Sequence, residues 1–188
     1  MSLHSYNTSV TDPIEFGGDP ALATARLTGA VRSLTEAEVD ALGALCDTTT
    51  DAEDRVKHGR DWWPLSLSWS LKNEVPQIPF AVCRPKNTQE VSALLAYCNT
   101  NSIPVTPSAG RSGVCGAAIP LSGGVALDMT AMQGIESVDE VSGIVEALAG
   151  TFHAAGVPLH RGQRPHRVCC GPALVSVGGG PRHHRARL

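Results

Sequence analysis

A short apolar segment, a helical pattern and a second apolar segment follow one another in residues 79–106, and this order restricts the possible folds more than any other feature of the chain. Residues 80–84 are mostly apolar and are followed by a proline, as is typical of a short strand. Asn87 and Glu90 have the spacing of a helix cap. Apolar residues then recur at helical intervals, at Val91, Leu94, Leu95 and Cys98. Residues 103–106 complete a predicted βαβ unit with parallel strands and a right-handed crossover.

A loop of small residues follows the second predicted strand. Its glycines lie three positions apart and most residues between them are small: Gly110, Gly113 and Gly116, with Ser108, Ala109 and Ser112. Few side-chain atoms would keep a ligand away from such a backbone, and successive amides in a turn form a concavity that suits a phosphate or diphosphate. The loop leaves the carboxyl end of a parallel strand, which is the edge at which α/β sheets favour ligands.

A purely structural interpretation of this loop stays open. The spacing is G-x-x-G-x-x-G, which differs from the dinucleotide fingerprint, and the Gly-Lys-Ser/Thr ending of a P-loop is absent. The alternative is a tight turn between two buried strands. Arg111 is the only cation of the loop, and it either pairs with an anion or faces water.

The segments after the loop predict more strands. Residues 124–129 read as a strand, and residues 135–141 and 143–150 read as a hairpin with its turn near Ser142 and Gly143. Together with the βαβ unit, these strands predict a mixed fold of helices and sheet.

The segments before residue 76 predict mainly helices after a flexible leader over residues 1–18. One helix is expected to start at Asp19, with apolar positions at Ala23, Leu27, Ala30, Val31 and Leu34. Thr35 and Glu38 form a possible capping box for a second helix. Its apolar face would hold Val39, Leu42, Leu45 and Cys46. Residues 48–54 are polar and are expected to form a loop.

All three tryptophans, Trp62, Trp63 and Trp69, lie within eight positions of one another. One interpretation is an anchor that packs the upstream segment on the core, because each indole buries a large area. The other is a wall of a ligand site. We favour the anchor.

Composition excludes several classes of protein. The 188 residues suffice for one domain, with room for an appendage. The net charge of −3 gives no bias toward nucleic acid or membranes, and no run of 18 apolar residues or signal-peptide pattern is present. Four of the six cysteines are isolated among apolar or small residues, as expected of buried thiols in a reducing cytoplasm: Cys46, Cys83, Cys98 and Cys115.

Charge is distributed unevenly along the chain. Residues 1–150 hold all 18 acidic residues and nine of the 15 lysines and arginines, whereas residues 151–188 hold six arginines, five of the seven histidines and no acid. Such a shift marks a boundary.

Residues 79–152 resemble the FAD-binding domain of the vanillyl-alcohol oxidase/PCMH superfamily. The motifs that carry the resemblance come in the family's order, over residues 79–85, 88–91, 103–107, 123–129 and 149–152. Residues 60–64 and 110–116 look most similar to bacterial relatives of alkyldihydroxyacetonephosphate synthase and of glycolate/D-lactate oxidase subunits.

The resemblance implies an α+β fold of two small subdomains with FAD between them. The first subdomain is expected to be largely complete, and the second to be missing or degenerate. The resemblance further implies that the flavin diphosphate is bound by backbone amides of the loop. The cofactor-binding residues it implies are Pro107, Ser108, Ala109, Gly110, Arg111, Ser112, Gly113, Gly116, Ser176 and Gly178.

Two departures from the family pattern concern the loop. Ser108 and Ala109 replace two of its three usual glycines, so the loop must accommodate two Cβ atoms. Some relatives attach flavin covalently through a His or Cys. The loop has no histidine, and we expect Cys115 to be a small buried residue rather than the attachment point.

The resemblance is expected to fail after Phe152. The domains implied are a leader over 1–18, a helical segment with the tryptophan anchor over 19–75, the FAD-binding part over 76–152 and an irregular basic tail over 153–188. We interpret the tail as an out-of-frame reading or a degenerate gene end. A zinc site and a nucleic-acid role in the tail are weaker alternatives, because its Cys and His spacing is wrong and it lacks aromatic residues for stacking.

Two functional hypotheses follow. By resemblance, a full-length relative would use FAD to oxidise a 2-hydroxy acid or to exchange the acyl group of acyl-dihydroxyacetone phosphate for an alkyl group. Its catalytic groups would lie in a later cap domain, so no catalytic residue is assigned here. The second hypothesis is a truncated, non-catalytic product that binds flavin weakly or not at all. Its apolar face would be partly uncovered at Val125, Leu127, Ile144 and Leu148.

Overall fold

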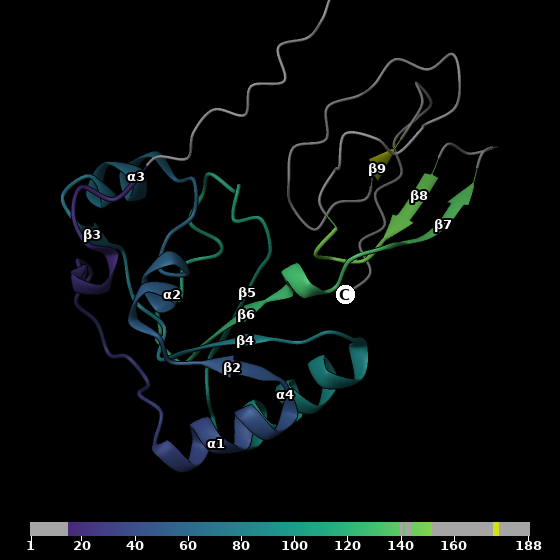
Figure 1. The fold of residues 1–188 in the computed structure, drawn as a ribbon, viewed down its shortest axis with the longest axis horizontal. Coiled ribbons are helices and arrows are strands. Elements are labelled where there is room, and N and C mark those ends of the chain that lie inside the picture. Colours follow the sequence, from purple (N-terminus) through teal and green to yellow (C-terminus); the bar gives the residue numbers. More distant parts are fainter. Residues whose placement is uncertain (1–14, 140, 142–143, 152–174, 177–188) are drawn as a thin grey trace, which may run out of the picture.

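The main sheet contains four strands in the order β2-β4-β6-β5 (Figure 1). The computed structural model describes residues 15–139, 141, 144–151 and 175–176. The strands of this sheet are β2 (Asp47–Thr49), β4 (Ala81–Arg84), β5 (Val105–Ser108) and β6 (Val125–Asp128). β4, β6 and β5 are parallel, and β2 pairs antiparallel with β4. The predicted βαβ unit is confirmed, with β6 inserted between its two strands.

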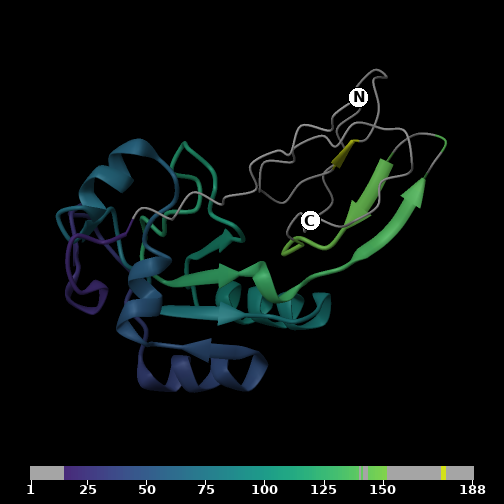
Figure 2. The same cartoon turned by 45° about the horizontal axis from the view of Figure 1, so that its top comes forward.

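Two helices cover one face of this sheet, α1 (Glu36–Leu45) and α4 (Thr88–Thr100) (Figure 2). The core between them and the sheet is apolar and contains Leu42, Cys46, Cys83, Leu94, Cys98, Ile103, Val125 and Leu127. Val125 and Leu127 are 0% and 3% exposed, so the prediction of a partly uncovered apolar face is wrong for these two residues, which the helices already cover. Leu148 is half-buried, and the side chain of Ile144 lies outside the described part of the structure.

The predicted helix caps are confirmed. The Thr35 side chain accepts a hydrogen bond from the Glu38 amide, and the Thr35 amide donates one to the Glu38 carboxylate. Asn87 caps α4 by accepting from the Glu90 amide. Leu94 is fully buried, but Leu95 is 44% exposed, because the sheet covers only a narrow stripe of α4.

The other face of the sheet faces α2 (Ala52–Lys57), which contacts β4. The segment before β4 also contains α3 (Pro64–Ser70) and a small parallel pair of β1 (Thr24–Ala25) with β3 (Glu74–Val75). A second apolar cluster holds this segment together, made of Ala23, Val56 and Val75 with Phe16 and Ile78 packed against it.

Two upstream predictions are wrong. Instead of a long helix from Asp19, the chain forms the 3-10 helix η1 (Pro20–Leu22) and then extends. The amides of Arg26 and Leu27 bond to carbonyls beside β3, and this pairing outweighs the helical spacing of the apolar residues. Within residues 48–54, β2 ends and α2 begins, because Asp51 caps that helix by accepting from the Asp54 amide.

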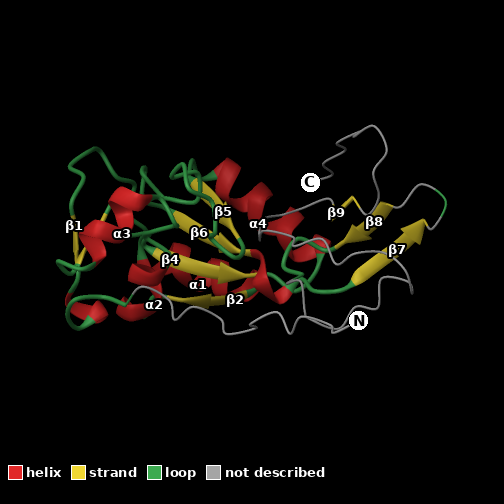
Figure 3. Ribbon diagram, turned by 90° about the horizontal axis from the view of Figure 1, so that it is seen from above, coloured by secondary structure: helices red, strands yellow, loops and turns green. Residues whose placement is uncertain are grey.

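The predicted hairpin is confirmed as β7 (Ile135–Asp139) with β8 (Ile144–Ala147). It joins β9 (Val175–Ser176) in a three-stranded sheet that projects from one end of the molecule (Figure 3). A 3-10 helix, η2 (Met129–Ala131), links β6 to this sheet. The predicted turn at Ser142 and Gly143 lies outside the described residues, as do residues 1–14 of the predicted leader and all of the predicted tail except 175–176.

Among the described residues, no helix combines the length and hydrophobicity needed to cross a bilayer.

Candidate functional site

Three parallel strands end side by side with polar residues. Arg84, Asp128 and Ser108 are the last residues of β4, β6 and β5. Asp128 is in register with Ser108, and the pairing of Cys83 with Leu127 places Arg84 beside Asp128. In-register neighbours of a parallel sheet point to the same face, so these side chains lie opposite the face that α1 and α4 cover. The edge of the sheet at which the carboxyl ends of these strands lie is therefore polar.

A charged network occupies this edge. His58 Nε2 lies 3.0 Å from Asp128 Oδ2, and Arg84 Nε donates to the same oxygen over 3.2 Å. Arg84 Nη2 donates to Asp54 Oδ1 over 2.7 Å. His58 and Asp128 are both buried. Burial alone would raise the pKa of Asp128, but hydrogen bonds from His58 and Thr130 outweigh it and hold that pKa well below its ordinary value.

The loop predicted from the sequence leaves this edge directly after Ser108. Within the part of the chain that the structure describes, no backbone amide from Gly110 to Gly116 donates a hydrogen bond. The hydroxyl oxygens of Ser108 and Ser112 are buried without a hydrogen-bond partner among the described residues, which is costly for polar groups. Together with the free amides, they indicate a site for an acceptor-rich ligand.

Arg111 adds positive charge to the loop. Its φ of 49° lies in the left-handed region, which is uncommon for a residue with a Cβ and is frequent at binding sites. Partial burial lowers the pKa of Arg111, and the charge of Asp128 opposes that effect. A half-buried guanidinium beside free amides is suited to bind an anion.

The tryptophan segment contacts the loop. The Trp62 amide donates to the carbonyl oxygens of Arg111 and Gly113, over 3.1 and 3.0 Å. Trp63 packs edge-to-face on Trp69 with ring centroids 5.6 Å apart, which fits the anchor interpretation. Trp62 is 54% exposed beside the loop, so it fits the ligand-wall interpretation better.

The structure brings eight of the ten predicted site residues together at the end of β5. Ser176 instead lies on β9, paired with Ile144, and Gly178 lies outside the described residues. Cys115 is exposed, so the expectation of a buried thiol is wrong for it and right for the other three isolated cysteines.

Sequence reasoning missed the charged network. A signal for two of its members was present: Arg84 and Asp128 are each the last residue of a short apolar strand. Nothing local in the sequence marks His58, which lies 70 positions before its partner Asp128. The described residues contain no cluster of three or more potential metal ligands.

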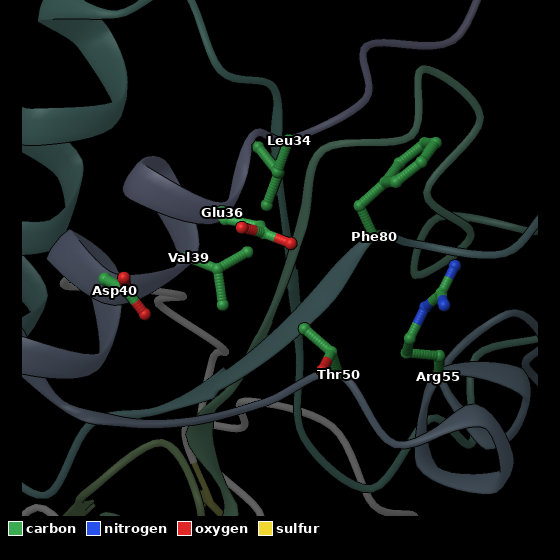
Figure 4. Close-up of a pocket in the computed structure, with 7 residues that line it drawn as sticks. All are labelled: Leu34, Glu36, Val39, Asp40, Thr50, Arg55 and Phe80. Carbon is green, nitrogen blue, oxygen red and sulfur yellow. The ribbon is translucent and has the colours of Figure 1, made fainter.

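A shallow groove of about 390 Å³ lies elsewhere, beside the amino end of β4 (Figure 4). Arg55 lies at one side of it, donates to the Pro79 carbonyl over 2.7 Å and stacks over Phe80. Glu36 and Asp40 of α1 lie at the other side. Because this groove is at the opposite end of β4 from the loop, it is not part of the candidate site.

Comparison with known proteins finds a family match over part of the chain. Residues 79–162 match the family model described as an FAD binding domain. Over this segment the chain is similar to that family, and its mixture of helices and strands agrees with the α+β fold that the sequence predicts. The match continues past Phe152, where the sequence analysis expects the resemblance to fail.

Curated relatives include a D-2-hydroxyglutarate dehydrogenase and a D-lactate dehydrogenase. The chain is 42% identical over 66 residues to the mitochondrial D-2-hydroxyglutarate dehydrogenase of Arabidopsis thaliana, covering 35% of this chain and 12% of that protein. It is 38% identical over 74 residues to the D-lactate dehydrogenase of Anaerostipes hadrus, covering 39% and 16%. The chain thus spans less than a fifth of the length of these relatives.

A solved structure of alkyldihydroxyacetonephosphate synthase shares the fold. It superposes with a TM-score of 0.58 at 20% identity, over 67% of this chain and 25% of that chain. At this identity the likeness shows the fold alone.

Proposed function

We propose that this chain binds FAD and that the loop Ser108–Gly116 holds the diphosphate. The observation that carries the proposal is the set of free donors: the amides from Gly110 to Gly116 and the Ser108 and Ser112 hydroxyls. A diphosphate supplies the acceptors and the negative charge that these groups lack. The residues therefore fit the group that the family match implies.

The protein residues would hold and orient the cofactor. Loop amides and the two serine hydroxyls donate to the phosphate oxygens, and Arg111 balances part of their charge. When bound, FAD supplies the two-electron redox chemistry. The charged network of His58, Asp128 and Arg84 fixes the strand ends from which the loop departs.

We further propose that the activity is oxidation of a D-2-hydroxy acid. The two relatives above, each more than 35% identical over the matched segment, carry names of this class. The alkyl-exchange reaction on acyl-dihydroxyacetone phosphate has support only from fold likeness. No catalytic residue is assigned to this chain.

The direct test is a titration of the purified chain with FAD and with FMN, followed by flavin fluorescence and the visible spectrum. FMN carries the same flavin but lacks the diphosphate. We expect FAD to bind in stoichiometric amount and at least about ten-fold more tightly than FMN, because only FAD places phosphate oxygens along the whole loop. Equal affinity for FAD and FMN would show that the loop does not bind the diphosphate.

A matched pair of serine variants locates the site. Ser112→Ala deletes an unpaired loop hydroxyl, whereas Ser122→Ala changes an exposed serine near the start of β6. We expect the first to weaken FAD binding by about ten-fold and the second to leave it unchanged. A folded wild-type chain that binds no FAD would refute the proposal and support the second hypothesis, a non-catalytic product.

A further inference from the structure

The turn Asp61–Trp63 lies upstream of the segment that matches the family model, yet it contacts the loop. Asp61 is 1% exposed, and its Oδ1 accepts a hydrogen bond from the Trp63 amide over 2.9 Å. This bond fixes the turn so that the Trp62 amide points at the loop, where it bridges the carbonyl oxygens of Arg111 and Gly113. The Trp62 amide thus holds both carbonyl oxygens on the same side of the loop.

Because the peptide bond is planar, the direction of these two carbonyls also sets the direction of the amides that follow them. In a trans peptide the C=O of one residue and the N–H of the next point in opposite directions, and the described residues contain no cis peptide. Since the carbonyls of Arg111 and Gly113 point toward Trp62, the amides of Ser112 and Val114 point away from it. These two amides belong to the run that is free of acceptors.

The charge of Asp61 lies on the side away from those amides. Its Oδ2 is buried without a partner among the described residues, and it lies 3.9 Å from the position that a Cβ on Gly113 would take. The carboxylate is therefore behind the loop, on the Trp62 side. An anion in front of the loop would meet the amides first and would be separated from this negative charge by the backbone.

We propose that Asp61 is a positioning residue for the loop: through the Trp62 amide it turns the amides of Ser112 and Val114 toward the face that receives the FAD diphosphate. This inference rests on the proposed function for the identity of the ligand. The orientation of the loop itself does not depend on that identity, so it can be measured without flavin.

Asp61→Ala removes the acceptor that fixes the turn, whereas Asp61→Asn keeps an oxygen at that position. Asp19→Ala is a matched control, because Asp19 makes the same contact to the residue two positions on, also over 2.9 Å, at the N-cap of η1. The flavin-free readout is tryptic cleavage after Arg111, which reports loop order. The second readout is the dissociation constant for FAD, measured on the full chain with thermal unfolding alongside.

We expect Asp61→Ala to speed cleavage after Arg111 several-fold and to weaken FAD binding about ten-fold. Asp61→Asn and Asp19→Ala should behave as wild type in both assays. Wild-type cleavage and affinity in Asp61→Ala would overturn the inference. So would equal losses in Asp61→Ala and Asp19→Ala, since that would show a general loss of stability.

If Asp61→Ala does not fold, a second pair of variants at Trp62 tests the same inference. Trp62→Pro removes the bridging N–H, and Trp62→Ala removes the indole but keeps the N–H. Faster cleavage only in Trp62→Pro supports the inference, and equal cleavage in both overturns it. If wild type binds no FAD while the cleavage pattern holds, the proposed function fails and the positioning of the loop stands.

Discussion

His58 and Asp128 form a buried hydrogen-bonded pair although they lie 70 positions apart in the sequence. Nδ1 of His58 lies 2.8 Å from the Asp54 carbonyl oxygen, and Nε2 lies 3.0 Å from the Asp128 carboxylate. Arg84 Nε donates to the same Asp128 oxygen, so one buried carboxylate oxygen joins the histidine and the arginine.

The first prediction concerns stability in acid. Hydrogen bonds from His58 and Thr130 overcome burial and depress the pKa of Asp128 in the folded state, so its contribution is present above the unfolded value near 3.8 and is lost as pH falls below it. We expect wild type to lose more unfolding free energy between pH 5 and pH 2 than Asp128→Asn. Urea unfolding at each pH measures the difference. The same pH dependence of the unfolding free energy in wild type and Asp128→Asn would contradict this account.

The second prediction concerns the strained residue of the loop. Arg111 has a φ of 49°, where glycine is tolerated better than alanine. Arg111→Gly should be more stable than Arg111→Ala by about 1 kcal/mol in thermal or urea unfolding. Both variants lose the guanidinium, so both should weaken FAD binding to a similar extent. Equal stability would show that the left-handed conformation is not retained in solution.

The third prediction separates neighbouring leucines on α4. Leu94 is fully buried in the core, whereas Leu95 is 44% exposed. Leu94→Ala should cost about 3 kcal/mol of unfolding free energy, because it removes buried methyl groups and leaves a cavity. Leu95→Ala, the same chemical change one position later, should stay within about 0.5 kcal/mol of wild type. Similar losses at both positions would contradict the orientation of the helix.

The fourth prediction concerns thiol reactivity. Burial raises the pKa of Cys83 to about 12 and that of Cys98 to about 11, whereas Cys115 is exposed. At pH 8 iodoacetamide should modify Cys115 in the folded protein and leave Cys83 and Cys98 unmodified until denaturant is added. Peptide mapping by mass spectrometry assigns the labelled positions, with Cys115→Ser as control. Labelling of Cys83 as fast as Cys115 would refute the burial of that thiol.

The sequence predicts those parts of the fold whose signals are local. The caps at Thr35 and Asn87, the helix they precede in each case and the strand from Val125 depend on residues within a few positions of one another. The helix expected from Asp19 fails because its amides pair with a distant segment, as Arg26 does with Val75. Helical periodicity shows only which residues are apolar. It cannot predict that the Arg26 amide will bond to a carbonyl 49 positions later in the chain.

The same distinction holds for the candidate site. The loop from Ser108 to Gly116 is visible in the sequence because most of its residues are small and consecutive. The network around Asp128 and the turn at Asp61 are built from single residues that meet only after folding. These residues meet near the carboxyl ends of the strands because of the strand order, and no short sequence motif predicts that order.

That strand order also limits when the domain can assemble on the ribosome. β6 is the last of its four strands to be synthesised, yet it lies between β4 and β5. A nascent chain that stops before Val125 has two parallel strands with an open gap and no ladder partner for β5. The loop from Ser108 to Gly116 would then follow an unpaired strand, so the proposed FAD site would form only after Asp128 has left the exit tunnel.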